Sequence, residues 1–120
     1  MNFIQTMRRL SQQMKNDPFG LDTLDIQFKI IEKLYKKNGM DIKLTCGACP
    51  EQYDVFKNGE QIAYYRLRHG YFRVDIPNCG GETIYEASPN GDGGFDKDER
   101  FKYMTEAMRV LITKTNKYVL

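Results

Sequence analysis

Hydrophobic residues recur at helical spacing in the first third of the chain. One apolar stripe consists of Phe3, Met7, Leu10 and Met14, and a second consists of Leu24, Phe28, Ile31 and Tyr35. Between them, the Asp-Pro-Phe-Gly stretch of residues 17–20 ends the first helix, because proline restricts the residue before it. Asp22 is the expected N-cap of the second helix, and Gly39 is its expected C′ residue. The pattern predicts a helical segment of two helices over residues 1–39.

From residue 40 onward the hydrophobic period falls to two, as it does in strands. Residues 40–44 alternate between apolar and charged side chains. Residues 53–56, a long hairpin over residues 62–76 and residues 83–87 continue this pattern, with turn residues between them. We expect an antiparallel β-meander of three to four strands over residues 40–88.

The hairpin divides into two different faces when His69 and Gly70 form a two-residue turn. Arg66 then lies opposite Arg73, and every second residue shares a face. The core side consists of Ala63, Tyr65, Leu67, Phe72, Val74 and Ile76, and the other side carries Tyr64, Arg66, Arg68, Tyr71, Arg73 and Asp75. One hairpin therefore supplies both core and candidate binding surface.

The length of the turn before this hairpin decides which side chains face the core. A two-residue Asn58–Gly59 loop puts Tyr53 and Val55 on the arginine side, whereas a three-residue loop of Lys57, Asn58 and Gly59 puts them in the core. We expect the three-residue loop, because Tyr53 and Val55 suit the core.

A glycine-rich stretch over residues 89–94 predicts a flexible break before the last helix. Asp96 and Glu99 have capping-box spacing, and an amphipathic pattern follows over residues 96–116. The element order predicts a single α+β domain over residues 1–120, with the C-terminal helix packed on one sheet face. In outline this order resembles the double-stranded-RNA-binding domain. That family has a basic segment at the start of its last helix, where this chain has Asp96, Asp98 and Glu99. The resemblance therefore does not imply the function of that family for this chain.

Composition excludes some classes of protein. The 120 residues are 41% hydrophobic and 28% charged with a net charge of +2, as in an ordinary globular protein with no strong overall field. Electrostatic recognition must therefore come from local clustering. No segment approaches the roughly 18 apolar residues of a membrane span, so we expect no membrane partner. Three cysteines and the lack of an apolar leader run predict a cytoplasmic protein.

The cysteine pair Cys46 and Cys49 invites a redox or metal interpretation. The βαβ pattern that accompanies a thioredoxin-like motif is missing. A zinc site would need His69 and Cys79 as further ligands, but the meander separates Cys79 from His69 by roughly 20 Å at strand rise. A partial site of Cys46, Cys49 and His69, or one shared between two chains, remains an alternative. We favour two free thiols, a His69 that serves the turn, and no cofactor.

The side that carries Tyr64, Arg66, Arg68, Tyr71 and Arg73 is the candidate binding site. Guanidinium groups bind phosphate and carboxylate, and tyrosine rings stack on bases. Arg66 opposite Arg73 costs stability unless an anion lies over the pair. The alternative is a merely solvated face, with Asp75 and Glu86 balancing the charge.

These features predict a non-enzymatic module that binds an acidic partner, either nucleic acid or a nucleic-acid-handling protein. A second hypothesis is a protein-interaction inhibitor or adaptor, such as a phage or mobile-element regulator or an antidefence protein. A third is a small metal or redox protein that uses the cysteine pair.

Overall fold

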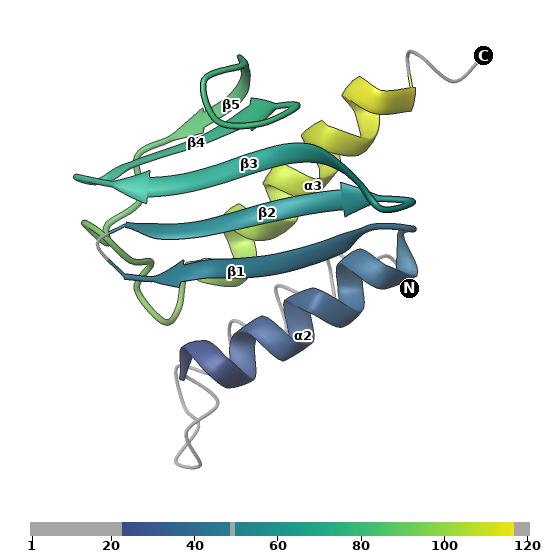
Figure 1. Ribbon diagram of the computed structural model, residues 1–120. Coiled ribbons are helices and arrows are strands. Elements are labelled where there is room, and N and C mark those ends of the chain that lie inside the picture. Colours follow the sequence, from purple (N-terminus) through teal and green to yellow (C-terminus); the bar gives the residue numbers. More distant parts are fainter. Residues whose placement is uncertain (1–22, 49, 117–120) are drawn as a thin grey trace.

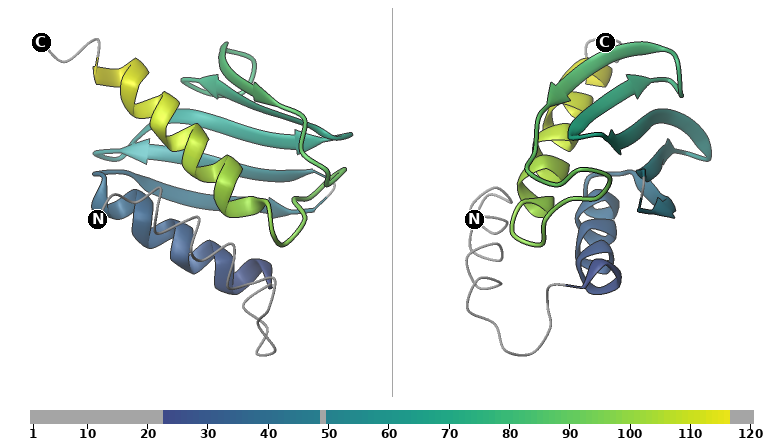
Figure 2. Two further views of the ribbon diagram at one scale, coloured as in Figure 1. Left: turned by 180° about the vertical axis from the view of Figure 1, so that it is seen from behind. Right: turned by 90° about the vertical axis from the view of Figure 1, so that its left-hand side faces the viewer.

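Two helices and a five-stranded sheet make up the part of the chain that the structure describes. The computed structural model describes residues 23–48 and 50–116 (Figure 1). The elements are α2 (Leu24–Lys37), β1 (Asp41–Gly47), β2 (Glu51–Lys57), β3 (Glu60–Arg68), β4 (Tyr71–Ile76), β5 (Glu82–Ala87) and α3 (Arg100–Asn116). Each strand pairs antiparallel with the next, in the order β1-β2-β3-β4-β5. Both helices lie on the same side of the sheet (Figure 2).

The predicted α+β class, the antiparallel meander and the C-terminal helix on one sheet face are confirmed. The expected strand number of three to four is wrong, because β1 is a full strand that pairs with β2 along its length. The first predicted helix lies outside the described residues, as does Asp22, the expected N-cap of the second helix. Thr23, and not Asp22, is the N-cap of α2: its Oγ1 accepts a hydrogen bond of 3.4 Å from the Ile26 amide.

The β3–β4 hairpin has the register that the alternation predicts. Arg66 lies opposite Arg73, and Leu67 lies opposite Phe72. His69 and Gly70 form the turn with φ angles of 53° and 71°, the left-handed pair that a tight hairpin turn requires. The predicted role of His69 as a turn residue is therefore confirmed.

The expected three-residue loop between β2 and β3 is wrong, although the face assignment behind it is right. Lys57 pairs with Glu60, so Asn58 and Gly59 alone form the turn, with φ angles of 53° and 81°. The register then shifts between Val55 and Phe56, which leaves one extra residue in β3. This bulge restores the alternation, and Val55 is buried in the core together with Tyr53.

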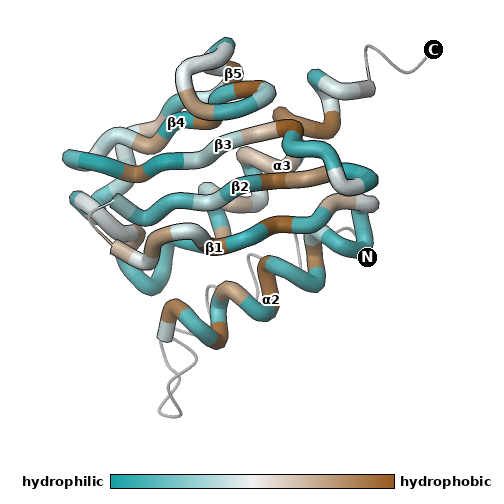
Figure 3. Tube along the Cα trace, in the orientation of Figure 1, coloured by the Kyte–Doolittle hydropathy of each residue, from teal (hydrophilic) through white to brown (hydrophobic). Residues whose placement is uncertain are grey.

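The core lies between the sheet and the two helices, and along the strands hydrophobic and hydrophilic positions alternate (Figure 3). Buried tyrosines make up much of this core. The hydroxyl of Tyr35 donates to the Met104 carbonyl oxygen at 2.7 Å and lies 2.9 Å from the hydroxyl of Tyr65. Burial, and then the neighbouring Tyr65, raise the pKa of Tyr35 well above its usual value of 10.0. Burial likewise raises the pKa of Tyr65, and burial with the nearby Glu51 raises that of Tyr53.

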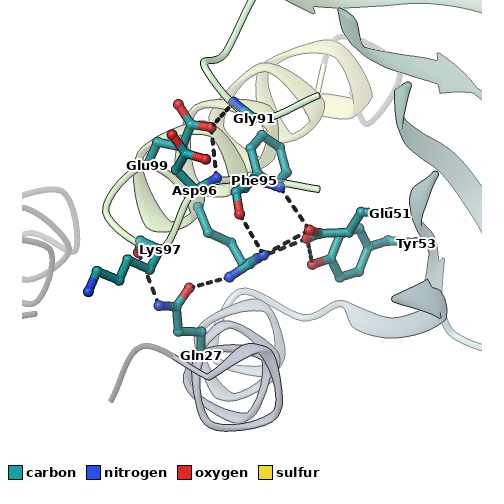
Figure 4. Close-up of polar contacts among 9 residues, drawn as sticks. Gln27, Glu51, Tyr53, Gly91, Phe95, Asp96, Lys97 and Glu99 are labelled. Carbon is teal, nitrogen blue, oxygen red and sulfur yellow. Dashed lines mark hydrogen bonds and ion pairs between the residues drawn. The ribbon is translucent and has the colours of Figure 1, made fainter. Parts of the chain in front are cut away.

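A buried ion pair joins the start of β2 to the start of α3 (Figure 4). The guanidinium of Arg100 donates from Nε and Nη2 to the two oxygens of Glu51, each at 2.9 Å. Glu51 is fully buried, and Arg100 is 5% exposed. Burial opposes the charge on Arg100, but its hydrogen bond and charge interaction with Glu51 outweigh this and raise its pKa. The pair is therefore held in its charged form.

Other polar groups complete this buried cluster. Arg100 also donates to Gln27 Oε1 of α2 at 2.7 Å and to the Phe95 carbonyl oxygen at 3.1 Å. Glu51 also accepts from the Tyr53 hydroxyl and, at 3.0 Å, from the Phe95 amide. The cluster thus connects α2, β2, α3 and the loop before α3, with both charges paired as burial requires.

The side chain of Glu99 holds the glycine-rich loop in which the sequence predicts a flexible break. The carboxylate of Glu99 accepts from the amides of Asn90 and Gly91 at 2.8 Å and from that of Asp96 at 2.9 Å. The last bond is half of the predicted capping box. A Cβ at Gly91 would lie 1.9 Å from the Gly94 carbonyl oxygen, so this crossing accepts glycine alone.

Removal of Arg100 should destabilise the fold strongly. Arg100→Ala leaves the carboxylate of Glu51 buried without its counter-ion, and we expect the free energy of unfolding to fall by about 3–5 kcal/mol. Urea denaturation measures this. Lys102→Ala, at an exposed position of the same helix, is the control and should change it by less than about 0.5 kcal/mol. Equal effects of the two variants would contradict a stabilising role for the buried pair.

The buried tyrosines predict a stability loss at alkaline pH. Their folded-state pKa values are raised, so they stabilise the fold fully below the unfolded pKa of 10.0, and this contribution falls as pH rises above it. The expected slope is about 1.4 kcal/mol per pH unit for each buried phenol. Urea denaturation between pH 8 and 11.5, with tyrosinate absorbance, measures it. Ionisation of all tyrosines near pH 10 in the folded protein would contradict the burial.

Candidate functional site

The face of the sheet opposite to the helices carries the predicted binding residues, and we call it the open face. Cross-strand rows order its side chains. One row runs through Gln52, Arg66, Arg73 and Glu86, and the next runs through Asp54, Tyr64, Asp75 and Thr83. Arg68 and Tyr71 pair at the end of the hairpin, beside the His69–Gly70 turn. All five predicted site residues therefore share one face.

Arg73 is held by a carboxylate on this face. Its Nε lies 3.2 Å from Oδ2 of Asp75, whose side chain is 3% exposed. The contact is an ion pair without an aligned hydrogen bond, because Arg73 Nε finds no acceptor in suitable geometry. Asp75 also accepts from the Gly80 amide at 3.1 Å and from Thr83 Oγ1 at 2.7 Å. Arg73 thus neutralises a buried carboxylate that anchors the β4–β5 loop.

Unlike Arg73, the side chains of Arg66 and Arg68 have no carboxylate partner among the described residues. Arg66 is half-buried and Arg68 is exposed, and neither side chain forms an ion pair or hydrogen bond with any residue that the structure describes. Arg66 also lies directly opposite Arg73, which already forms an ion pair with Asp75. The guanidinium groups of Arg66 and Arg68 are therefore available to an anion from outside the chain.

The two tyrosines of the predicted site also differ. Tyr71 is 39% exposed, and its hydroxyl donates to Glu86 Oε1; this hydrogen bond raises its pKa. Tyr64 lies on the predicted face but is only 8% exposed, so little of its ring is available to a partner. Its hydroxyl donates to Gln52 Oε1, and burial and the nearby Cys79 thiol raise its pKa. Cys79, in the loop after β4, thus lies near Tyr64, a contact that alternation alone does not indicate.

The accessible part of the site is thus smaller than the predicted set. Arg66, Arg68 and Tyr71 lie toward the same end of the open face, next to the exposed side chain of His69. The turn there is fastened, since the Gly70 amide donates to the Asp92 carbonyl oxygen at 2.8 Å. This end presents two cationic forks and one aromatic ring on a fixed hairpin.

The cysteines do not gather around His69. Cys46 is half-buried, and its thiol donates to the Ala48 carbonyl oxygen at 3.4 Å. Cys49 lies outside the described residues. Cys79 follows β4, whereas His69 precedes it, so the two lie at opposite ends of that strand. Among residues 23–48 and 50–116, no three His, Cys, Asp or Glu side chains form a group that could hold a metal ion.

Sequence reasoning missed the cluster around Glu51 and Arg100. A signal was available, because Glu51 has the same alternation as Tyr53 and Val55, which places a carboxylate on the core face. Its partner Arg100 is 49 residues away, and sequence spacing does not identify such a partner. Both oxygens of Glu51 accept from protein donors, so this cluster serves the fold rather than a ligand.

Comparisons with protein-family models, with curated proteins and with solved structures found no match to this chain. Within the described part of the chain, no helix has the length and apolar character needed to cross a membrane. The open face must therefore be interpreted from its own chemistry.

Replacing Arg73 by alanine should lower the stability of the fold, whereas replacing Arg66 should not. Arg73→Ala leaves Asp75 buried without its counter-ion, and we expect the free energy of unfolding to fall by about 1–3 kcal/mol. Arg66→Ala removes a like charge opposite Arg73, so stability should stay within about 0.5 kcal/mol or rise. Urea denaturation at low salt measures both. A larger loss for Arg66→Ala than for Arg73→Ala would contradict these assignments.

Proposed function

We propose that this protein is a non-enzymatic binding module that takes a nucleic acid on the open face of its sheet. The observation that supports this most is that the guanidinium groups of Arg66 and Arg68 have no ion-pair partner among the described residues and lie beside the exposed ring of Tyr71. Guanidinium forks bind phosphate in two-pronged geometry. An aromatic ring next to them offers a stacking surface for a base.

The spacing of the two arginines suits an extended polyanion. Residues two apart on a strand lie about 7 Å from each other on the same face. Arg66 and Arg68 can therefore each take a separate phosphate, while Tyr71 lies opposite Arg68. A sheet face offers a shallow surface for an unpaired strand, whose bases are free to stack.

The small net charge limits the strength of this interaction. With a net charge of +2, attraction depends on the local arginines. Two or three phosphate contacts to single-stranded nucleic acid predict a slope of log affinity against log salt of about −1.4 to −2.1. Affinity should be modest and sensitive to salt.

An acidic protein surface is the second candidate partner. The carboxylate of Glu86 stands in the same row as Arg66 and Arg73, and that of Asp54 stands in the next row. This mixed pattern suits a protein surface of complementary charge. An inhibitor or adaptor, such as a regulator or antidefence protein of a phage or mobile element, would use the face in this way. The third hypothesis, a metal or redox protein, depends on Cys49 and has no further support in the described residues.

Charge reversal at the two arginines tests the proposal. Arg66→Glu/Arg68→Glu should weaken binding of fluorescent 12-nucleotide dT and rU strands at least tenfold and bring the salt slope near zero, because the phosphate contacts are lost. Fluorescence anisotropy between 20 and 200 mM salt measures this.

The matched control is Lys29→Glu/Lys33→Glu, which reverses two exposed lysines of α2. It changes the net charge by the same amount, but at a site away from the open face. It should retain most of the affinity. No binding of either strand at 20 mM salt, or equal loss in both double variants, would overturn nucleic acid as the partner. A pull-down from the native host that depends on Arg66 and Arg68 would then identify a protein partner.

A further inference from the structure

An exposed carboxylate stands among the cations of the proposed nucleic-acid site. Glu86 of β5 is exposed and lies directly opposite Arg73 on the open face. Arg73 forms its ion pair with Asp75 instead, and Glu86 forms none with any residue that the structure describes. The Tyr71 hydroxyl that donates to Glu86 is neutral, so Glu86 keeps its negative charge. A carboxylate repels phosphate, so a binding role for Glu86 must concern the bases.

The hydrogen bond from Tyr71 holds this carboxylate beside the ring on which a base is proposed to stack. Tyr71 lies two residues from Arg73 on β4, which makes it a diagonal neighbour of Glu86. Diagonal neighbours are about 7–8 Å apart, within reach of aromatic and long side chains. On its other side, Tyr71 lies opposite Arg68. A base stacked on Tyr71 therefore has its phosphate near the arginines and an edge near Glu86.

The carboxylate has acceptor positions left for that edge. Its two oxygens offer about four such positions. The Tyr71 hydroxyl takes one position on Oε1, and Oε2 accepts from no residue that the structure describes. Glu86 thus presents acceptors and no donor beside the stacking ring.

Guanine is the base whose edge matches such a group. Its N1–H and its N2 amino group are adjacent donors, so both can donate to one carboxylate. Adenine and cytosine place an acceptor nitrogen next to their amino group, and thymine and uracil have a single N–H between two carbonyl oxygens. Each of these edges brings a lone pair toward the carboxylate, which costs binding free energy. An acceptor-only group therefore favours guanine over the other bases.

We infer, on the basis of the proposed function, that Glu86 selects guanine in the strand that binds the open face. The base stacks on Tyr71 and donates from N1 and N2 to the carboxylate of Glu86, while Arg66 and Arg68 bind phosphates. Tyr71 has two roles, because its ring stacks and its hydroxyl orients Glu86. Repulsion between Glu86 and phosphate weakens the binding of every strand, and the two hydrogen bonds offset it only at guanine. The site therefore favours single strands that contain guanine.

Fluorescence anisotropy with 12-nucleotide DNA strands tests this base selection. The strands d(TTG)4, d(TTA)4, d(TTC)4 and d(TTI)4, in which I is inosine, differ only at every third base. The guanine strand should bind at least about fivefold more tightly than the adenine and cytosine strands, as expected for a two-pronged contact. The inosine strand should lose this advantage in part or in full, because inosine lacks the N2 amino group. A strand with 7-deazaguanine should keep it, because only N7 is removed.

Three variants separate the roles of the side chains. Glu86→Gln should lose the guanine preference, because an amide presents a donor where the carboxylate presents an acceptor. Its affinity for d(TTA)4 should not fall, since a charge that repels phosphate is removed. Tyr71→Phe keeps the ring and loses the hydroxyl, so it should reduce the preference. Glu60→Gln is the matched control, which removes the same charge at the exposed start of β3, and it should keep the preference.

The outcomes distinguish the two proposals. If no strand binds at 20 mM salt, both the proposed function and the role of Glu86 fail. If all strands bind equally, or if Glu86→Gln keeps the preference, the binding module stands and base selection by Glu86 is overturned. Loss of the preference with 7-deazaguanine would also overturn it, because an arginine would then read the N7 edge.

A competition experiment separates a strand from a free nucleotide as the source of the guanine. Guanosine 5′-monophosphate brings the same base with a single phosphate. It should displace d(TTG)4 only at concentrations at least about tenfold above those at which the unlabelled strand does, because it lacks the neighbouring phosphates. Equal competition would overturn a strand as the ligand of this site.

Discussion

The ion pair between Glu51 and Arg100 is the constraint on which the arrangement of this protein depends. It joins the first residue of β2 to the first residue of α3, and Gln27 extends it to α2. A charge pair buried this deeply is stable only when both partners and their remaining donors and acceptors are satisfied. That requirement brings both described helices to the same end of the sheet and draws the loop before α3 across it.

The same constraint leaves one sheet face without either described helix packed on it. Because both helices cover one side, the other side carries charged and polar rows between edge strands β1 and β5. The loop before α3 also binds the Gly70 amide, which fastens the hairpin that bears Arg66 and Arg68.

Alternation in the sequence was sufficient to predict the faces of the sheet. It placed Arg66 opposite Arg73 and Leu67 with Phe72 in the core, because a strand has a period of two and the turn needs residues that tolerate positive φ. The β2–β3 turn was wrong in length, yet its faces were right, since burial of Tyr53 and Val55 requires the bulge. Local propensity favoured the short Asn-Gly turn, and core burial corrected the register within the strand.

By itself, the sequence determined the fold class, the strand faces and the residues from which a binding face could be built, because these follow from local periodicity. Tertiary structure decided which of those residues are available. Asp75 pairs with Arg73, and Tyr64 is buried near Cys79, so Arg66, Arg68 and Tyr71 remain accessible. It also decided that Glu51 meets Arg100 across 49 residues. Such pairings depend on chain segments that meet only after folding, and no spacing along the chain records them.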